Sequence, residues 1–275
     1  MDEPSWHDKQ YPPSLSIPNA GAIFESWKSR AAATRAKLPY KADIAYGPHP
    51  RETLDFYPAA HAEGCVIFIH GGYWLEFSKL ETSWVAEGFV GQGLSVALIN
   101  YPLCPEVKID DIRTSCMNAF AHLYRNVLSA TEREAVVVTG HSAGGYLAVA
   151  HLTENWVTHG LPHNPMKGVL ALSGVFDVQP LIDTSLNASL RLDASQATAL
   201  NLNNMQLRTT AQLSFAVGQN ESEAFHSQSM ELAEKWSSLS PQLIDLQGAN
   251  HFTIVDDLAS PNGQLNKLAV AMTRR

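Results

Sequence analysis

The sequence predicts an α/β fold in which a mostly parallel sheet of eight strands is covered by helices on both faces. Two observations support this prediction: short runs that favour strands alternate with helical segments, and the later runs are apolar on both sides. Strands that alternate with helices form parallel crossovers, and strands covered on both faces lose the alternation of polar and apolar residues. With 275 residues, 45% of them hydrophobic, the chain can bury the core of one such domain.

The strand-forming runs are short and are separated by turn residues or helical segments. The first two are joined tightly through Gly47-Pro48-His49-Pro50, which predicts a hairpin-like connection. We predict eight strands, at residues 42–46, 53–57, 65–69, 95–100, 135–139, 168–173, 212–217 and 242–246.

Two segments between these runs carry apolar residues at helical spacing. The first covers residues 109–127 and begins with Ile109 and Ile112, and the second covers residues 225–236. Ser222 is placed to cap the second helix, because a serine hydroxyl can accept a hydrogen bond from a free N–H of the first turn.

We expect one domain over residues 1–275, with two segments that stand apart from the alternating pattern. Residues 1–40 form an N-terminal extension with Pro12-Pro13 and one helix-like stretch near residues 20–38. Residues 175–211, after the sixth strand, have weak periodicity, and a segment this long without clear elements is uncommon unless it is functional. We interpret it as a lid or substrate-shaping insertion; the alternative is a set of short helices that pad the sheet edge.

The composition argues against several classes of partner. A formal net charge of -8 with scattered acidic residues disfavours nucleic acid and anionic membranes. The start lacks the pattern of a signal peptide, and no run approaches the about 18 apolar residues that span a bilayer. Three cysteines (Cys65, Cys104 and Cys116) cannot all pair, so we expect reduced thiols and a cytoplasmic protein. The expected partner is a small-molecule substrate, and a homodimer is left open.

The strongest chemical signal is a Gly-x-Ser-x-Gly motif at residues 140–144. An apolar strand precedes it and an apolar helical run follows it. A serine hydroxyl needs a base to become a nucleophile, and a sharp strand-to-helix turn holds it clear of the sheet. This context predicts the α/β-hydrolase fold, with Ser142 as the nucleophile.

The run HGGYW at residues 70–74 follows the third predicted strand, where the oxyanion loop of this fold belongs. Glycine lets the backbone approach a substrate closely enough for its N–H groups to bind a developing oxyanion. We predict that Gly71 or Gly72 supplies one donor and that Ala143 supplies the other. His70 is interpreted as a structural residue that braces this loop.

The base and the acid follow from the chain order Ser, acid, His. His251 is the one histidine after the last predicted strand, in a loop that begins with Gly248, and it is the predicted base. Glu221 follows the seventh strand and is the predicted acid. Asp177, at the end of the sixth strand, is the alternative acid.

The sequence gives no sign of a metal or cofactor site, although it contains eleven histidines. It has no HExxH motif, no paired clusters of Cys and His, no Gly-rich dinucleotide fingerprint and no P-loop. We therefore expect neither a metal nor a cofactor.

With these motifs assembled, the sequence resembles the kynurenine formamidases (arylformamidases), in the esterase/lipase group of α/β hydrolases. The resemblance covers most of the chain and departs from the family pattern near residues 198–207. It implies Ser142 as nucleophile, His251 as base and Glu221 as acid, with Glu where the family usually has Asp. The matching segments are YPP at 11–13, HGGYW at 70–74, NYPLCP at 100–105, GHSAGG at 140–145, VGQ at 217–219, FH at 225–226 and HFTIVDDL at 251–258.

The resulting hypothesis is hydrolysis of an aryl formamide such as N-formylkynurenine through an acyl-enzyme. Tyr73 and Trp74, beside the oxyanion loop, could contact the aryl group or simply pack. One alternative is a carboxylesterase for short acyl esters, because the same machinery hydrolyses both. A second alternative is a ligand-binding homologue without catalysis.

Overall fold

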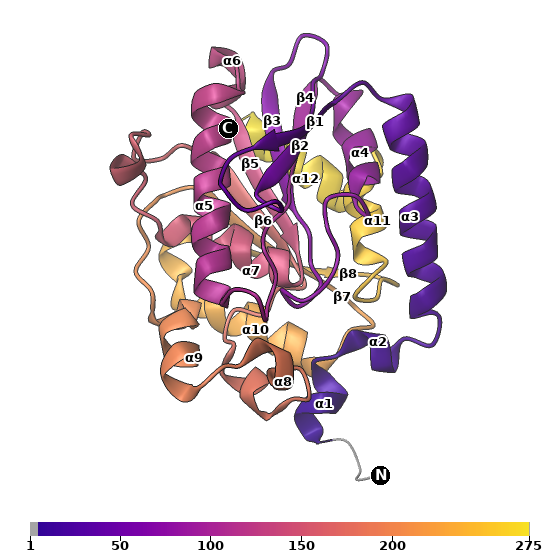
Figure 1. Ribbon diagram of the computed structural model, residues 1–275, viewed down its shortest axis with the longest axis vertical. Coiled ribbons are helices and arrows are strands. Elements are labelled where there is room, and N and C mark those ends of the chain that lie inside the picture. The colour runs from indigo at the N-terminus through magenta and orange to yellow at the C-terminus, as the bar shows by residue number, and fades with distance from the viewer. Residues whose placement is uncertain (1–4, 275) are drawn as a thin grey trace.

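The computed structural model describes residues 5–274, and its centre is one eight-stranded sheet (Figure 1). The strand order is β1-β2-β4-β3-β5-β6-β7-β8; β2 is antiparallel to β1 and β4, and all other pairs are parallel. The prediction of a mostly parallel sheet of eight strands is confirmed. The strands are β1 (Lys41–Ala45), β2 (Thr53–Tyr57), β3 (Gly64–Ile69), β4 (Leu94–Ile99), β5 (Val136–His141), β6 (Gly168–Leu172), β7 (Gln212–Gly218) and β8 (Gln242–Leu246).

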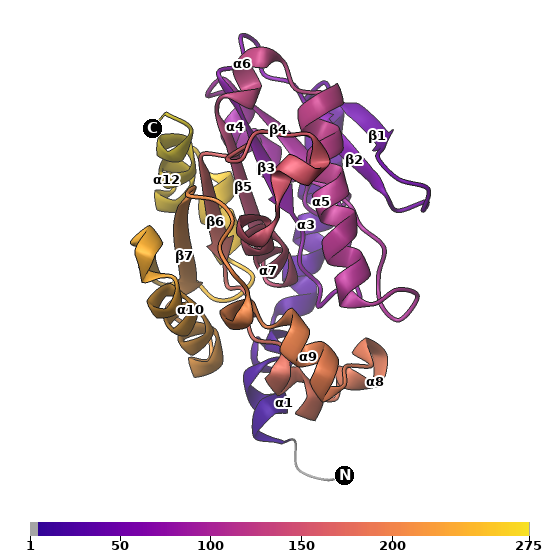
Figure 2. The ribbon, with the colours of Figure 1, turned by 90° about the vertical axis from the view of Figure 1, so that its left-hand side faces the viewer.

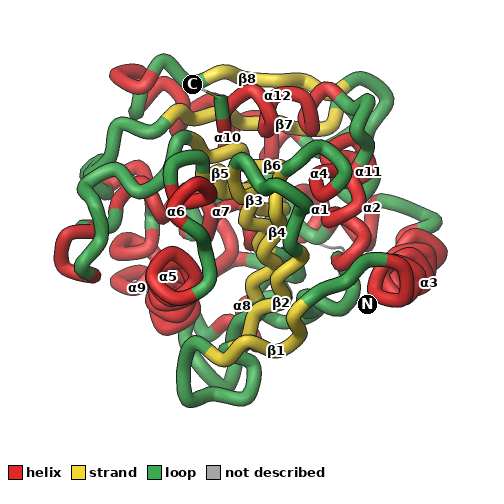
Figure 3. The backbone as a smooth tube through the Cα atoms, turned by 90° about the horizontal axis from the view of Figure 1, so that it is seen from above, coloured by secondary structure: helices red, strands yellow, loops and turns green. Residues whose placement is uncertain are grey.

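The central strands are buried along their whole length because helices cover both faces of the sheet (Figure 3). One apolar core lies between the sheet and α5, α7 and α10, and the other lies between the sheet and α3, α4, α11 and α12. The helices are α1 (Trp6–Gln10), α2 (Pro13–Ser16), α3 (Ala20–Lys37), α4 (Glu87–Val90), α5 (Ile109–Asn126), α6 (Ala130–Arg133), α7 (Ala143–Ala150), α8 (Asn187–Leu190), α9 (Ala194–Leu200), α10 (Glu223–Lys235), α11 (Ile254–Ala259) and α12 (Gln264–Thr273). The 3-10 helices are η1 (Ser83–Ala86), η2 (His151–Thr153), η3 (Trp156–His159), η4 (Gln179–Asp183), η5 (Leu202–Asn204) and η6 (Ser237–Leu239).

The register of β3 and β5 brings two of the sequence motifs together. The two strands run parallel, and Ile69 at the end of β3 lies opposite Gly140 in β5. The HGGYW run therefore leaves the sheet beside the turn that carries Ser142. Parallel strands place their following loops at the same edge of the sheet, which is where sites in such folds form.

The N-terminal extension and the 175–211 insertion meet at one end of the sheet, where α1 contacts η4. Figures 1 and 2 show α1, α8 and α9 at this end of the molecule. Asp8 in α1 accepts hydrogen bonds from the N–H and the hydroxyl of Ser185, at 2.8 and 2.9 Å. The insertion folds into η4, α8, α9 and η5. We refer to residues 5–16 and 175–211 together as the cover; a role as a lid stays a prediction.

Ser222 corrects one expectation from the sequence. It occupies the N-cap position of α10, but its side chain forms no capping hydrogen bond. Its hydroxyl instead donates to the carbonyl oxygen of Gln10 at 2.6 Å, because residues 5–16 run across the start of α10. Ser222 therefore joins the cover to the body of the protein.

None of the helices formed by residues 5–274 combines the length and the apolar character that crossing a bilayer requires.

Candidate active site

Ser142 sits on a sharp turn between β5 and α7, in a backbone conformation that few residues other than glycine adopt (φ 56°, ψ -120°). Two glycines make this turn sterically feasible. A Cβ atom at Gly140 would lie 2.0 Å from the carbonyl oxygen of Gly144, and one at Gly144 would lie 2.0 Å from that of Ile69. The N–H of Ser142 donates to Leu172 in β6 at 2.8 Å, which ties the turn to the sheet.

The HGGYW loop lies against this turn. A Cβ atom at Gly71 would stand 3.0 Å from the Cβ of Ser142, so the Gly71 backbone approaches the serine directly. Gly72 has a φ of 101°, and its carbonyl accepts the N–H groups of Leu75 and Glu76 at 2.8 and 3.0 Å. On the other side, Ala143 is the first residue of α7, so its N–H has no acceptor within the helix. The structure thus brings the three predicted oxyanion residues around Ser142.

His70 lies beneath the loop and is buried. Its Nδ1–H donates to the carbonyl oxygen of Gly71 at 2.8 Å, and its ring stacks on Tyr101 with centroids 4.2 Å apart. The Tyr101 hydroxyl donates to the carbonyl oxygens of His70 and Gly71. Burial lowers the pKa of His70 to about 3, so the ring is neutral at physiological pH. These contacts match the bracing role expected from the sequence.

His251 and Glu221 form a buried hydrogen-bonded pair. His251 Nδ1–H donates to Glu221 Oε2 at 2.6 Å, and the two side chains are 3% and 0% exposed. Glu221 Oε1 accepts from the Ser173 hydroxyl and from the N–H of Gly218, both at 2.6 Å. These three donors hold the Glu221 carboxylate in a fixed position. With Nδ1 as the donor, Nε2 of His251 is left as the basic nitrogen of the ring.

The alternative acid, Asp177, does not meet His251. Its carboxylate accepts the N–H of Gln179 at 2.9 Å, as a short side chain often does at the start of a turn. The structure therefore selects Glu221 as the partner of His251. The sequence analysis did not identify Ser173, whose hydroxyl binds Glu221. The available signal was a serine at the end of the sixth strand, next to the strand that precedes the predicted acid.

His141 is a second residue that the sequence analysis did not place in the site. Its Nε2–H donates to the carbonyl oxygen of His251 at 2.6 Å, and the two rings are 4.8 Å apart. Burial, and then the nearby charge on His251 when that ring is protonated, hold the pKa of His141 well below its usual value. His141 is therefore a neutral donor that fixes the backbone of the His251 loop.

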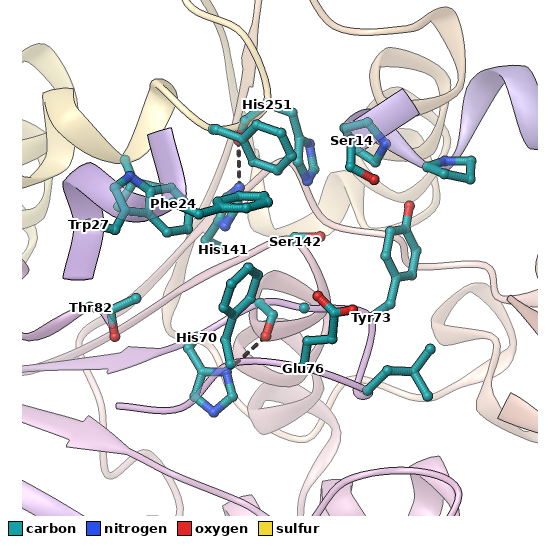
Figure 4. A pocket seen from close by; sticks show the side chains of 18 of the residues that line it. Ser14, Phe24, Trp27, His70, Tyr73, Glu76, Thr82, His141, Ser142 and His251 are labelled. Atoms are coloured by element: carbon teal, nitrogen blue, oxygen red, sulfur yellow. Dashed lines mark hydrogen bonds between the residues drawn. The ribbon is translucent and has the colours of Figure 1, made fainter. Parts of the chain in front are cut away.

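Ser142 and His251 face a cavity of about 120 Å³ with mainly apolar and aromatic walls (Figure 4). The N-terminal extension supplies part of the wall, which the sequence did not indicate, and Leu186 of the 175–211 insertion also lines it. The lining residues are Pro12, Pro13, Ser14, Phe24, Trp27, Phe68, His70, Gly71, Gly72, Tyr73, Leu75, Glu76, Phe77, Thr82, His141, Ser142, Leu186, His251, Phe252 and Val255.

Tyr73 and Trp74 differ although they are adjacent. Tyr73 lines the cavity, and its hydroxyl donates to the carbonyl oxygen of Tyr11. Trp74 is fully buried away from the cavity and packs edge-to-face on Tyr146, with centroids 5.6 Å apart. The turn directs the two side chains to opposite sides, so the proposed substrate contact by Trp74 was wrong, and a contact by Tyr73 stays a prediction.

The polar groups around the cavity offer acid–base chemistry rather than metal ligation. They are the hydroxyl groups of Ser14, Tyr73, Thr82 and Ser142, three histidines that include His251, and the carboxylate of Glu76. Across residues 5–274, no three side chains of His, Cys, Asp or Glu converge in a way that could hold a metal ion.

The fold and this geometry define an α/β hydrolase, and comparison with known families agrees. A family model described as the alpha/beta hydrolase fold matches residues 66–253. The chain therefore belongs to the α/β-hydrolase family, and it is a hydrolase.

Within this family, the chain is similar to kynurenine formamidases. It is 29% identical to a kynurenine formamidase of Danio rerio, over 96% of this chain and 94% of the relative, and 28% identical to that of Salmo salar, over 84% and 81%. The solved structure of a candidate thioesterase from Silicibacter sp. TM1040 is 30% identical, covers 98% of this chain and 99% of its own, and has a TM-score of 0.87.

Proposed function

We propose that this hydrolase cleaves N-formyl aryl amines, such as N-formylkynurenine, with Ser142 as nucleophile, His251 as base and Glu221 as acid. The observation that carries the proposal is the buried bond from His251 to Glu221 beside a serine held on a strained turn. A carboxylate in this place orients the imidazole and stabilises its protonated form. The aromatic cavity and the similarity to kynurenine formamidases support an aryl formamide as the substrate.

The first half of the reaction forms a formyl-enzyme. Ser142 Oγ attacks the formyl carbon while Nε2 of His251 takes the hydroxyl proton. The N–H groups of Gly71 or Gly72 and of Ala143 bind the negative oxygen of the tetrahedral intermediate. His251 then returns the proton to the nitrogen of the aryl amine, the C–N bond breaks, and the amine leaves.

The second half releases formate. A water molecule enters the place of the amine, and His251 takes one of its protons as the oxygen attacks the formyl carbon. The second tetrahedral intermediate collapses, the bond to Ser142 Oγ breaks, and the serine recovers its proton from His251. The sum is one formamide and one water consumed, and one amine and one formic acid produced.

The size of the cavity favours a small acyl group. Its volume of about 120 Å³ is below the roughly 300–1,000 Å³ of sites that enclose a drug-sized ligand. A formyl group fits beside Ser142, and the aryl group fills the aromatic remainder. A substrate of the size of N-formylkynurenine then extends to the mouth of the cavity, where Glu76 lies.

A second candidate is hydrolysis of short-chain esters or thioesters. The observation that favours it is the similarity over almost the whole chain to the structure of the candidate thioesterase. The same serine, base and oxyanion donors serve both reactions, because each passes through an acyl-enzyme.

The test is the turnover of N-formyl-L-kynurenine, followed as kynurenine appears, with Ser142→Ala as the control. We expect serine-dependent turnover with a kcat/KM well above that for an aryl acetate and for an acyl thioester. Slow formamide turnover with fast ester or thioester turnover would refute the proposed substrate and leave the proposed catalytic residues in place. Turnover retained by Ser142→Ala would refute the mechanism.

A further inference from the structure

Among the described residues, Glu76 is a carboxylate without a partner, in a cavity that no Lys or Arg lines. It is exposed at the surface, lines the cavity and points into it, from the side opposite His251 in the view of Figure 4. Within residues 5–274 its side chain forms no hydrogen bond and no ion pair, and no Lys or Arg lines the cavity. The proposed reaction does not use this carboxylate, which leaves its charge available to a ligand.

The position of Glu76 relative to Ser142 is fixed by the loop that carries both Gly71 and Gly72. The Glu76 N–H donates to the Gly72 carbonyl at 3.0 Å, which closes the turn. Gly71, at the start of the same turn, lies against Ser142. The backbone of Glu76 is therefore held at a set place relative to the serine, which keeps its carboxylate within reach of a ligand in the cavity.

The cavity walls beside Glu76 are also suited to a cation. Six aromatic side chains line this cavity: Phe24, Trp27, Phe68, Tyr73, Phe77 and Phe252. The face of an aromatic ring attracts a nearby ammonium group, and it stacks equally well on an aryl group. An aryl compound that bears an ammonium group would match both the rings and the carboxylate.

The cations nearest in the chain to Glu76 are occupied elsewhere. Lys79 is buried and pairs with Asp43 and Asp55. Arg51 donates to the carbonyl oxygens of Phe77 and Tyr101, at 2.6 and 2.8 Å, on the inner side of the loop. A carboxylate on the substrate would therefore be repelled by the negative charge of Glu76, and no Lys or Arg of the cavity would compensate for that repulsion.

We propose that Glu76 selects substrates whose leaving group is an aryl amine with a cationic side chain, and that it disfavours anionic ones. This inference rests on the proposed function, since it names the leaving group of that reaction. The ammonium group of a kynurenine side chain meets this requirement. The carboxylate of the same side chain must then point away from Glu76, because no Lys or Arg lines the cavity.

The test compares three N-formylanilines that differ only in an ortho side chain of equal length, which ends in an ammonium, a methyl or a carboxylate group. The kcat/KM of each is measured for the wild type, for Glu76→Gln and for Glu134→Gln. Glu134 is exposed before β5, at the opposite end of the strand from Ser142, so this control makes the same change of charge away from the cavity.

We expect the wild type to prefer the cationic over the neutral compound by about fivefold, the scale of an exposed charge pair, and to be slowest with the anionic one. In Glu76→Gln, the kcat/KM of the cationic compound should become nearly equal to that of the neutral compound. In Glu134→Gln, the ratio of these two values should stay as in the wild type. A wild-type ratio already near one, or a ratio that Glu76→Gln leaves unchanged, would overturn the inference.

Two further measurements keep the inference separate from the proposed function and from misfolding. If the neutral formanilide is not hydrolysed, the proposed substrate fails, and the same charge series is measured as aryl acetates. If Glu76→Gln does not fold, the wild-type ratio of kcat/KM for the cationic and the neutral compound is measured at a low and at a high concentration of NaCl. It should fall with salt, because screening weakens an exposed pair, and a ratio that does not respond to salt refutes the role of Glu76.

Discussion

The reaction centre and the cover are held in place by different kinds of contact. Ser142, Glu221 and His251 sit on the segments that follow β5, β7 and β8, and backbone hydrogen bonds or buried side chains fix each of them. The 175–211 part of the cover packs into the apolar core, through residues such as Phe176 and Leu181. Residues 5–16 are joined to later parts of the chain by hydrogen bonds that involve polar side chains: Asp8 with Ser185, Gln10 with Ser222, and Tyr11 with Gln228.

This difference separates two properties of the enzyme. Changes in the proposed reaction centre should lower kcat, because they alter the groups that we propose to act in the transition state. Changes in the contacts of the cover should alter KM and local stability, because they act on access to the cavity and leave those groups in place. The following predictions test this separation, from the largest expected effect to the smallest.

The largest effect is expected for Glu221→Gln. The amide keeps the size of the side chain but removes its charge, and it presents an N–H that favours the wrong tautomer of His251. We expect kcat for a formanilide to fall by about 10³–10⁴ with little change in the melting temperature. Steady-state kinetics and thermal unfolding measure the two effects.

The matched control is Glu223→Gln, two residues further along, in the exposed first turn of α10. It should retain wild-type turnover. Equal losses in both variants, or a loss of less than tenfold in Glu221→Gln, would mean that the bond to His251 does not serve catalysis.

The next effect is expected for Gln228→Leu, at the main junction of the cover. Gln228 is buried; it accepts the N–H groups of Phe176 and Asp177 at 2.8 Å and donates to the Tyr11 hydroxyl at 3.0 Å. Leucine leaves these groups unpaired, so we expect the free energy of unfolding to fall by about 3 kcal/mol. KM should change more than kcat.

Gln92→Leu is the control for this variant, because Gln92 bonds to Gly88 and Asn266, which do not line the cavity. It should lower stability without changing KM. A change in kcat alone for Gln228→Leu would contradict the expectation that the contacts of the cover act on KM and on stability.

A fall in pH should lower the free energy of unfolding, because the buried histidines gain protons more easily when the protein is unfolded. Burial lowers the pKa of His151 to about 4, while its Nδ1–H donates to Leu147. Because this pKa is below the unfolded value of about 6.5, His151 contributes stability above pH 6.5, and that contribution is lost as the pH falls from 6.5 toward 4. His151→Asn keeps a donor and removes the titration.

We therefore expect the stability of His151→Asn to fall less steeply with acid, by about 1 kcal/mol per pH unit between pH 6 and 4. Urea unfolding at a series of pH values measures this slope. Parallel curves for the variant and the wild type would show that His151 does not bind a proton on unfolding.

The smallest effect is expected for Tyr73→Phe, which removes the hydroxyl that donates to Tyr11. We expect the free energy that holds residues 5–16 against the rest of the protein to fall by about 1 kcal/mol. The segment should then be cleaved faster by a protease. Tyr46→Phe removes a comparable bond to Asn100, away from the cover, and should leave the cleavage rate unchanged. Equal rates in all three proteins would contradict the role of this hydroxyl.

The sequence was sufficient for the strands and for the residues around Ser142, because these depend on local patterns. Buried parallel strands show as apolar runs, and the nucleophile turn requires glycines at positions 140 and 144. Chain order then led to His251 and Glu221, since the acid and the base of this fold follow fixed strands.

The walls of the cavity were not predictable in the same way. Phe24 and Trp27 belong to a helix more than 100 residues before Ser142, and no local pattern relates a helix to a distant cavity. Trp74 was misjudged because a turn with positive φ at consecutive residues directs neighbouring side chains to opposite sides. Ser222 was misjudged because its hydroxyl found a partner in a distant segment, Gln10, rather than in its own helix.

The attachment of residues 5–16 has a consequence for biosynthesis. This segment leaves the ribosome early, but its partners Ser185, Ser222 and Gln228 are about 170–220 residues further along the chain. Strands β3 to β5 can pair while later parts are still being made. The wall of the cavity that contains Pro12 and Pro13 therefore forms only after α10 has been synthesised, so a nascent chain would carry Ser142 for some time in an open, incomplete pocket.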